Sequence, residues 1–244
     1  MSESEIKAMK TIKKAKDMST KELARYIDYS VLKPEFTEDE IVELCKDGVK
    51  LGVAQVCINP AYMDLCAPYV KGSITKLGPT CDFPFGTSST KSKVEQAKIV
   101  LAYDCVGEVD MVANFGWIRS GKYDAVAEEI SQVAKVCHDK NIELKVILET
   151  DALTKEEIKK ACHAVVKGGA DWVKSSTGFL TGHECVGASL EVIQLMIDEV
   201  GDQIKVKGSG CIRTREHFLN LIDMGVTRMG VGYKSVPVVL GLDK

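Results

Sequence analysis

The chain has 244 residues, of which 45% are hydrophobic and 27% are charged, a balance typical of a globular protein that folds without disulfides or a structural metal. Thirty-two basic and thirty-five acidic side chains give a net charge of −3, which argues against a nucleic-acid-binding protein. The sequence contains no run of about 18 apolar residues and no signal-peptide pattern, so we expect a cytoplasmic protein that binds neither nucleic acid nor membrane.

The first twenty residues differ from the rest in their basic character. Five lysines fall within ten positions: Lys7, Lys10, Lys13, Lys14 and Lys16. Apolar residues recur between them at helical spacing, which predicts a solvated, basic helical extension over 1–20, with a surface-seeking amphipathic helix as the alternative. Nothing in the composition divides the remainder, so we expect one domain over 21–244.

Short apolar runs then alternate with segments of helical periodicity. The runs predicted as strands begin near Ile27, Val53, Ile74, Glu108, Ile142, Asp171, Ile204 and Thr227. Helices are predicted in segments that include 37–50, 88–103, 123–140 and 154–167. Thr37 and Thr154 are typical N-caps before acidic first turns. Eight strand–helix units in a chain of this length predict an α/β protein with a single TIM (β/α)₈ barrel; a doubly wound open sheet is the alternative.

The direction of side chains in these strands follows from their alternation, because successive residues of a barrel strand face the interior and the surrounding helices in turn. In 108–114 the apolar residues take the outer positions, which turns Asp110 inward. The fifth, sixth and seventh strands each turn a lysine inward, namely Lys145, Lys174 and Lys207. Further polar residues with inward parity are Asp28, Ser30, Gln55, Cys57, Asn59, Glu108, Asn114, Glu143, Glu149, Lys205 and Ser209.

Inward lysines are unusual, because barrel interiors are normally filled by branched aliphatic side chains. Burial and neighbouring cations both lower the pKa of a lysine ammonium group and leave a free amine near neutral pH. A free amine attacks a carbonyl to form a Schiff base, and a nearby carboxylate can move protons during C–C cleavage. The pattern therefore predicts a metal-free aldolase; a paired ionic layer without a catalytic role is the alternative.

The segment Asp171-Trp-Val-Lys-Ser-Ser-Thr-Gly-Phe179 resembles the Schiff-base segment of the deoxyribose-phosphate aldolase family. Six further motifs resemble that family in the same order: 27–34 (IDYSVLKP), 56–60 (VCINP), 83–86 (FPFG), 108–112 (EVDMV), 144–150 (LKVILET) and 206–214 (VKGSGCIRT). The resemblance covers roughly residues 20–232, and its seven collinear motifs are more specific than any one of them alone.

The resemblance implies a TIM barrel that reversibly cleaves 2-deoxyribose 5-phosphate to acetaldehyde and glyceraldehyde 3-phosphate. It assigns the Schiff base to Lys174, the lowering of its pKa to Lys207, proton relay to Asp110 and electrostatic support to Lys145. It implies a small sugar-phosphate or aldehyde substrate and neither a metal ion nor a cofactor. By analogy with similar barrels, a homodimer is expected.

The resemblance also implies that phosphate sits on glycine-rich loops after strands six to eight. Thr177-Gly178 and Gly208-Ser209-Gly210 match that arrangement, and Gly232, Lys234 and Ser235 are further candidates for phosphate binding from a rearranged loop after strand eight. The chain departs from the family in three places. Cys211 stands where a second glycine is usual. In 230–236, GVGYKSV replaces a Gly-Ala-Ser-Ser run, and Tyr29-Ser30 replaces His-Thr. These departures leave open a related Schiff-base lyase with another substrate, or a catalytically silent ligand-binding paralogue.

The remaining candidate groups are assigned structural roles. The nine cysteines are scattered without a CxxC pair, so we expect reduced thiols, and Cys57 is interpreted as a packing residue. His138, His163 and His217 fall on predicted helices, and His183-Glu184-Cys185 without a second cluster is weak support for a metal site.

Overall fold

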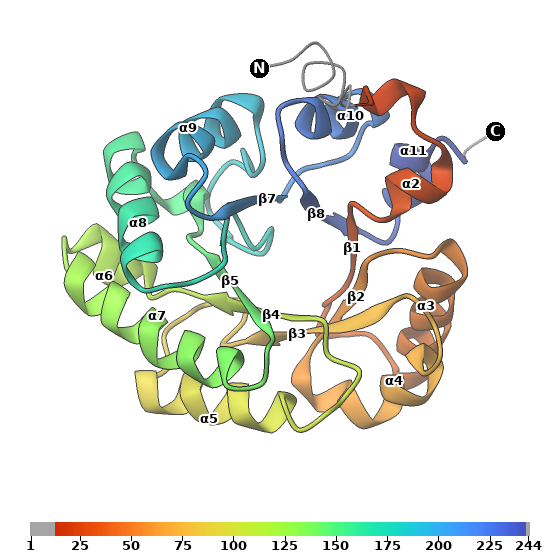
Figure 1. Ribbon diagram of the computed structural model, residues 1–244, viewed down its shortest axis with the longest axis horizontal. Coiled ribbons are helices and arrows are strands. Elements are labelled where there is room, and N and C mark those ends of the chain that lie inside the picture. The colour runs from red at the N-terminus through yellow and green to blue at the C-terminus, as the bar shows by residue number, and fades with distance from the viewer. Residues whose placement is uncertain (1–12, 243–244) are drawn as a thin grey trace, which may run out of the picture.

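The protein is a closed barrel of parallel strands in the computed structural model, which describes residues 13–242. Each strand pairs in parallel with the next along the chain, and the last pairs with the first through Ile27 opposite Met229. Figure 1 shows the strands as an inner ring with the helices packed around it. The predicted TIM barrel is thereby confirmed, and the open sheet is excluded because a closed sheet has no edge strands.

Every strand begins within two residues of its predicted start. The strands are β1 (Ile27–Val31), β2 (Gln55–Ile58), β3 (Lys76–Cys81), β4 (Glu108–Val112), β5 (Glu143–Ile147), β6 (Trp172–Lys174), β7 (Lys205–Ser209) and β8 (Arg228–Gly232). The predicted alternation also holds, since outward residues such as Val109, Met111 and Leu144 are fully buried against the helices. Burial of one such side chain contributes roughly 1.5–3 kcal/mol to folding.

The helices follow the strands in the predicted order. They are η1 (Ala15–Asp17), α2 (Thr20–Ala24), α3 (Glu38–Leu51), η2 (Pro60–Tyr62), α4 (Met63–Val70), α5 (Thr90–Val100), α6 (Phe115–Arg119), α7 (Tyr123–His138), η3 (Thr150–Ala152), α8 (Lys155–Lys167), α9 (Leu190–Val200), α10 (Arg215–Asp223) and α11 (Val236–Leu240). Within residues 13–242, no helix is long and apolar enough to cross a bilayer.

The predicted N-caps are confirmed at atomic detail. The Thr37 hydroxyl accepts a hydrogen bond from the backbone N–H of Glu40, whose carboxylate accepts one from the backbone N–H of Thr37. Thr154 and Glu157 form the same reciprocal pair before α8. Such caps satisfy backbone donors that have no partner inside the helix.

The predicted N-terminal extension is described only in part, because residues 1–12 lie outside the described range. The described part lies against the barrel: Ala15 is buried, and its backbone N–H donates to the Asp223 carboxylate at 2.9 Å. Ser19 is the N-cap of helix α2 and forms a capping box with Glu22. The boundary between extension and barrel at residue 20 stays a prediction.

Candidate active site

The inward lysines of three neighbouring strands meet one carboxylate in the barrel interior. Asp110 lies on β4, and its Oδ2 accepts hydrogen bonds from Lys174 Nζ of β6 at 2.7 Å and Lys207 Nζ of β7 at 2.6 Å. Lys145 Nζ of β5 lies 3.3 Å from Asp110 Oδ1. The structure therefore brings together the four residues to which the sequence analysis gave catalytic roles.

The three lysines differ in burial and in the number of carboxylates that they contact. Lys145 and Lys207 are completely buried, whereas Lys174 is the last residue of β6 and keeps 3% of its surface exposed. Lys174 hydrogen-bonds to Asp110 alone, but Lys207 also donates to Asp28, a second buried carboxylate, which belongs to β1. The lysine with the fewest counter-charges is therefore the one nearest the C-terminal end of the barrel.

These contacts shift the pKa values of the four residues in different directions. Burial lowers the pKa of Lys174, and the positive charge of Lys207 adds to this effect against the opposing pull of Asp110. Burial disfavours charge on Lys207 as well, but Asp110 and Asp28 outweigh it and raise the pKa of Lys207. At Asp110, burial is outweighed by Lys145 and the other lysines, which hold the pKa of that carboxyl far below its usual range. Lys174 is thus the best candidate for a free amine, beside a permanent cation and an ionised carboxylate.

A cavity of about 190 Å³ opens at the C-terminal ends of β6, β7, β8 and β1. Its lining comprises Ser30, Thr177, Gly178, Phe179, Ser209, Gly210, Cys211, Ile212, Arg213, Gly230, Gly232 and Ser235. A Cβ on Gly230 would lie 2.7 Å from Ser209 Oγ and 3.8 Å from Lys207 Cε, so glycine keeps the inner wall open toward the lysines. The cavity has the position of active sites in this fold, at the loops after the strands.

Six of the eight predicted phosphate residues line this cavity: Thr177, Gly178, Ser209, Gly210, Gly232 and Ser235. Gly208 does not, because its Cα faces Ala188 and Met229 on the helix side of β7. Lys234 does not line it either; its ammonium group lies 5.8 Å from the centre of the Tyr233 ring, and the residue is exposed. Arg213 is a further cation of the lining; it belongs to the family-like motif 206–214 but was not predicted to bind phosphate.

The Thr177 loop is fixed by a buried carboxylate. Glu149 accepts hydrogen bonds from the Thr177 hydroxyl and from its backbone N–H at 3.3 Å. Burial raises the pKa of Glu149. The Thr177 hydroxyl also accepts from the backbone N–H of Phe179 at 3.0 Å, so the turn after β6 has a defined shape.

The expectation that all cysteines are reduced thiols is wrong for two of them. Cys185, in the loop after β6, forms a disulfide with Cys211, in the loop after β7. The two loops touch directly, since the Ala188 backbone N–H donates to Gly210 O at 3.0 Å and a Cβ on Gly187 would lie 2.4 Å from that oxygen. Strand neighbours in a barrel bring these loops together although 26 positions separate the cysteines, so close sequence spacing was the wrong criterion.

The other candidate groups have structural partners. Burial raises the pKa of Cys57 to about 12, which leaves an unreactive thiol and agrees with a packing role. Asp28, Cys57 and Asp110 offer atoms within 4.8 Å of one another, a spacing suited to a metal ion, but lysine ammonium groups bind both carboxylates. The disulfide also occupies the Sγ atom of Cys185, the cysteine of the weak metal motif.

The predicted surface or packing roles of three histidines agree with their contacts. His138 Nε2 lies 2.8 Å from the Asp171 carboxylate, and His163 Nε2 lies 2.9 Å from that of Glu199. His217 Nε2 lies 2.8 Å from the backbone oxygen of Ala188.

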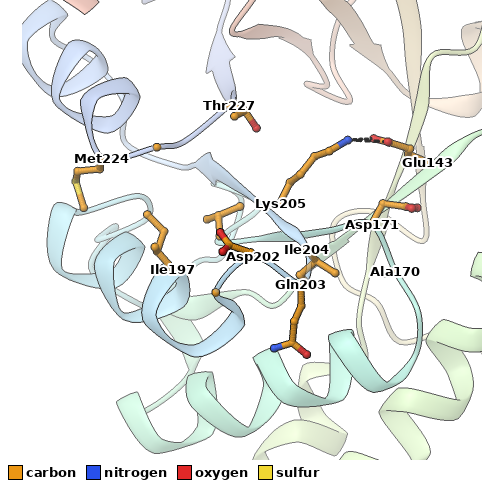
Figure 2. Close-up of a pocket in the computed structure, with 13 residues that line it drawn as sticks. Glu143, Ala170, Asp171, Ile197, Asp202, Gln203, Ile204, Lys205, Met224 and Thr227 are labelled. Atoms are coloured by element: carbon orange, nitrogen blue, oxygen red, sulfur yellow. Dashed lines mark hydrogen bonds and ion pairs between the residues drawn. The ribbon is translucent and has the colours of Figure 1, made fainter. Parts of the chain in front are cut away.

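A larger cavity of about 570 Å³ opens at the opposite end of the barrel. Figure 2 shows Lys205 reaching Glu143 there, with a separation of 2.6 Å between Nζ and Oε1. Both side chains are over one-third exposed, and none of the three interior lysines lines this cavity. The ion pair of Lys205 with Glu143 is thus solvated and separate from the buried lysines around Asp110.

Comparison with known proteins agrees with this geometry. The model of the DeoC/LacD family of aldolases matches residues 12–235. A Thermococcus kodakarensis protein named deoxyribose-phosphate aldolase is 40% identical over 226 residues, which cover 92% of this chain and 98% of the relative. A Desulfitobacterium hafniense protein of the same name is 41% identical over 213 residues, covering 87% and 95%.

Two solved structures share the architecture. The aldolase QR15 superposes with a TM-score of 0.81 at 34% identity, covering 90% of this chain and 95% of QR15. The deoxyribose phosphate aldolase of Aeropyrum pernix, described as a tetramer, has a TM-score of 0.81 at 25% identity, covering 91% of each chain. On the family match and the length of these similarities, the chain belongs to the DeoC/LacD family of aldolases.

Proposed function

We propose that this aldolase reversibly cleaves 2-deoxy-D-ribose 5-phosphate to acetaldehyde and D-glyceraldehyde 3-phosphate through a Schiff base on Lys174. The observation that carries the proposal is the contact of Lys174 Nζ with Asp110 Oδ2 at 2.7 Å, beside the buried cation of Lys207. The names of the curated relatives support the substrate.

The residues take separate roles in the cleavage direction. The Lys174 amine attacks the C1 aldehyde of the open-chain sugar, and loss of water gives an iminium ion. Asp110, held as a carboxylate, accepts the C3 hydroxyl proton directly or through water. The C2–C3 bond then breaks, its electrons pass into the iminium, and glyceraldehyde 3-phosphate leaves. Protonation of the enamine at C2 and hydrolysis release acetaldehyde and the free lysine.

Lys207 and Lys145 support this chemistry by their charge. The pKa of both is raised by Asp110 and Asp28 against the opposing effect of burial, so both remain protonated. Lys207 thereby keeps a positive charge beside the Lys174 amine and disfavours its protonation.

The cavity at the strand ends is the proposed phosphate site. Backbone N–H groups of its glycine loops and the hydroxyls of Thr177, Ser209 and Ser235 are donors suited to phosphate, and Arg213 supplies a cation. Ser235 keeps one hydroxyl on the cavity although the run 230–236 departs from the family pattern.

A related Schiff-base lyase with another aldehyde or sugar phosphate is the second candidate, because Lys234 does not line the cavity and Cys211 replaces a glycine in its wall. A panel with 2-deoxyribose 5-phosphate, unphosphorylated 2-deoxyribose and other sugar phosphates separates the two. The first function requires the highest kcat/KM of the panel for 2-deoxyribose 5-phosphate.

Borohydride reduction in the presence of 2-deoxyribose 5-phosphate tests the mechanism. We expect a stable adduct by intact mass, mapped to the peptide that contains Lys174 and absent from Lys174→Leu. Lys160→Leu, which removes an exposed lysine of α8, is the matched control and should trap normally. No adduct from folded wild-type protein would contradict the proposal and would favour a silent ligand-binding paralogue.

The assembly and location belong to the same proposal. We infer a homodimer acting in the cytoplasm without a metal ion or cofactor, with a basic extension at residues 1–20. Light scattering after size-exclusion chromatography tests the dimer against the tetramer described for the Aeropyrum pernix relative. Undiminished turnover after dialysis against a chelator tests the metal independence.

A further inference from the structure

A second set of charges lies below the proposed Schiff-base lysine, toward the N-terminal ends of the strands. Arg228, the first residue of β8, donates from Nη1 to Asp28 Oδ1 and to Glu108 Oε2, both at 2.9 Å. Its Nη2 donates to Glu108 Oε1 at 3.0 Å, which makes the pair with Glu108 bidentate. Asp28 also accepts from Lys207, which donates to Asp110. One shared carboxylate therefore joins Arg228 to the lysine beside the reactive amine.

Other charged groups near Arg228 are satisfied elsewhere. Lys205 and Arg228 both lie over the Trp172 ring: Lys205 Nζ is 4.6 Å and Arg228 Cζ is 5.6 Å from the ring centre. Lys205, however, forms its ion pair with Glu143. The Arg25 guanidinium, before β1, lies close enough to interact electrostatically with Arg228, Asp28 and Glu108, but its hydrogen bonds go to backbone carbonyl groups. Arg228 thus differs from these neighbours in being bonded to the interior carboxylates.

The charges of this interior network balance when Lys174 is a free amine. Its carboxylates are Asp28, Glu108 and Asp110, and the cations bonded to them, apart from Lys174, are Lys145, Lys207 and Arg228. Three negative charges meet three positive charges before Lys174 is counted. A proton on Lys174 would add a charge without a counter-ion at a site that is almost completely buried, which is costly.

We propose that Arg228 is a positioning residue for the aldol reaction: with Glu108 it completes the charge balance that keeps Lys174 a free amine, and it holds Asp28 against Lys207. The inference rests on the Schiff-base role proposed for Lys174. Loss of the Arg228 charge would leave one negative charge in excess around a neutral Lys174. The excess is relieved by a proton on Lys174, because the amine is a stronger base than any of the carboxylates in the network.

The direct test measures the protonation of Lys174 without turnover. Wild-type protein and variants are labelled briefly with acetic anhydride, which acylates only neutral amines, over a range of pH, and the Lys174 peptide is quantified by mass spectrometry. We expect the midpoint to rise by about one pH unit in Arg228→Met and to fall by about one unit in Glu108→Gln. One unit corresponds to about tenfold in the free-amine fraction on the acid side.

Opposite shifts in two neighbouring variants would not result from general damage to the fold. Arg228→Lys keeps the charge and should restore most of the wild-type midpoint. Lys205→Met is the matched control: it removes a cation from the same Trp172 ring, and its midpoint should stay at the wild-type value. The acid limb of kcat/KM for 2-deoxyribose 5-phosphate should move with the labelling midpoint.

Unchanged midpoints in Arg228→Met and Glu108→Gln, or shifts in the same direction, would overturn the inference. If Arg228→Met does not fold, as judged by circular dichroism, Glu108→Gln and Arg228→Lys decide the question alone. Borohydride trapping on the wild-type protein reports separately on the proposed function. A wild-type protein that traps substrate while the variants show no shift refutes the role of Arg228 and leaves the aldolase mechanism standing.

Discussion

Lys93 on α5 forms the best-defined buried ion pair outside the barrel interior. Its Nζ lies 2.9 Å from the Glu129 carboxylate of α7 and donates to Gly86 O at 3.0 Å and Val112 O at 2.9 Å. Both charged side chains are completely inaccessible to solvent. The pair therefore connects two helices to the end of β4 and to the loop after β3.

Lys93→Met should destabilise the protein strongly, because it leaves the Glu129 carboxylate buried without a counter-charge. Breaking a buried pair from one side costs about 3–5 kcal/mol, and the two carbonyl groups also lose their donor. The double variant Lys93→Met/Glu129→Met removes both charges and should recover at least about 2 kcal/mol of that loss. On the same helix, Lys98→Met breaks an exposed pair with Glu95 and should cost less than about 1 kcal/mol.

The loss of stability in Lys93→Met should also depend on pH. Burial already raises the pKa of Glu129, and removal of the neighbouring ammonium group raises it further. A carboxyl whose folded-state pKa lies above its unfolded value binds more protons in the folded state, so stability increases as pH falls from the folded pKa toward the unfolded pKa. The deficit measured at pH 7 should therefore shrink at pH 5.

Urea unfolding followed by circular dichroism at both pH values measures these differences. A loss below about 1 kcal/mol in Lys93→Met, or a deficit that grows at pH 5, would refute the assignment of Glu129 as a charged partner that depends on Lys93.

Three further predictions follow from the site. Cys185→Ser removes the disulfide. For cysteines 26 positions apart, the chain-entropy relation gives a decrease of about 3.5 kcal/mol in the free energy of unfolding, or roughly 10 °C in the melting temperature. Calorimetry of the wild-type protein with and without reductant should show the same difference. Lys207→Leu removes the cation beside Lys174, so the pKa of Lys174 should rise and the acid limb of kcat/KM should move to higher pH. Gly230→Ala places a Cβ 2.7 Å from the Ser209 hydroxyl, so KM for 2-deoxyribose 5-phosphate should rise several-fold in steady-state assays while the protein remains folded.

The barrel and its interior lysines could be predicted because one rule governs every strand. Period-two alternation fixes which side of a strand faces inward, and closure of the sheet then brings all inward residues into one space. This rule was enough to predict the proximity of four inward residues, Asp110, Lys145, Lys174 and Lys207. The same alternation gives Arg228 the inward parity of β8, so its inward direction could also be predicted from the sequence.

Contacts between loops could not be predicted in the same way. Cys185 and Cys211 lie beyond the strand ends, where no periodicity fixes the direction of a side chain, and only the neighbouring positions of β6 and β7 bring their loops together. Lys234 lies in a loop that departs from the family pattern, and its direction could not be predicted either: its ammonium group lies 5.8 Å from the centre of the Tyr233 ring, and the residue does not line the cavity.

The arrangement of the three interior lysines gives a physical reason why only one is suited to nucleophilic attack. Lys145 and Lys207 each contact two or more carboxylates, and these contacts raise their pKa despite complete burial. Lys174 has a single carboxylate partner, which it shares with Lys207, so burial prevails and its pKa is lowered. A positive charge on Lys174 is therefore unfavourable, and its reactivity follows from the unequal distribution of carboxylates among the three lysines.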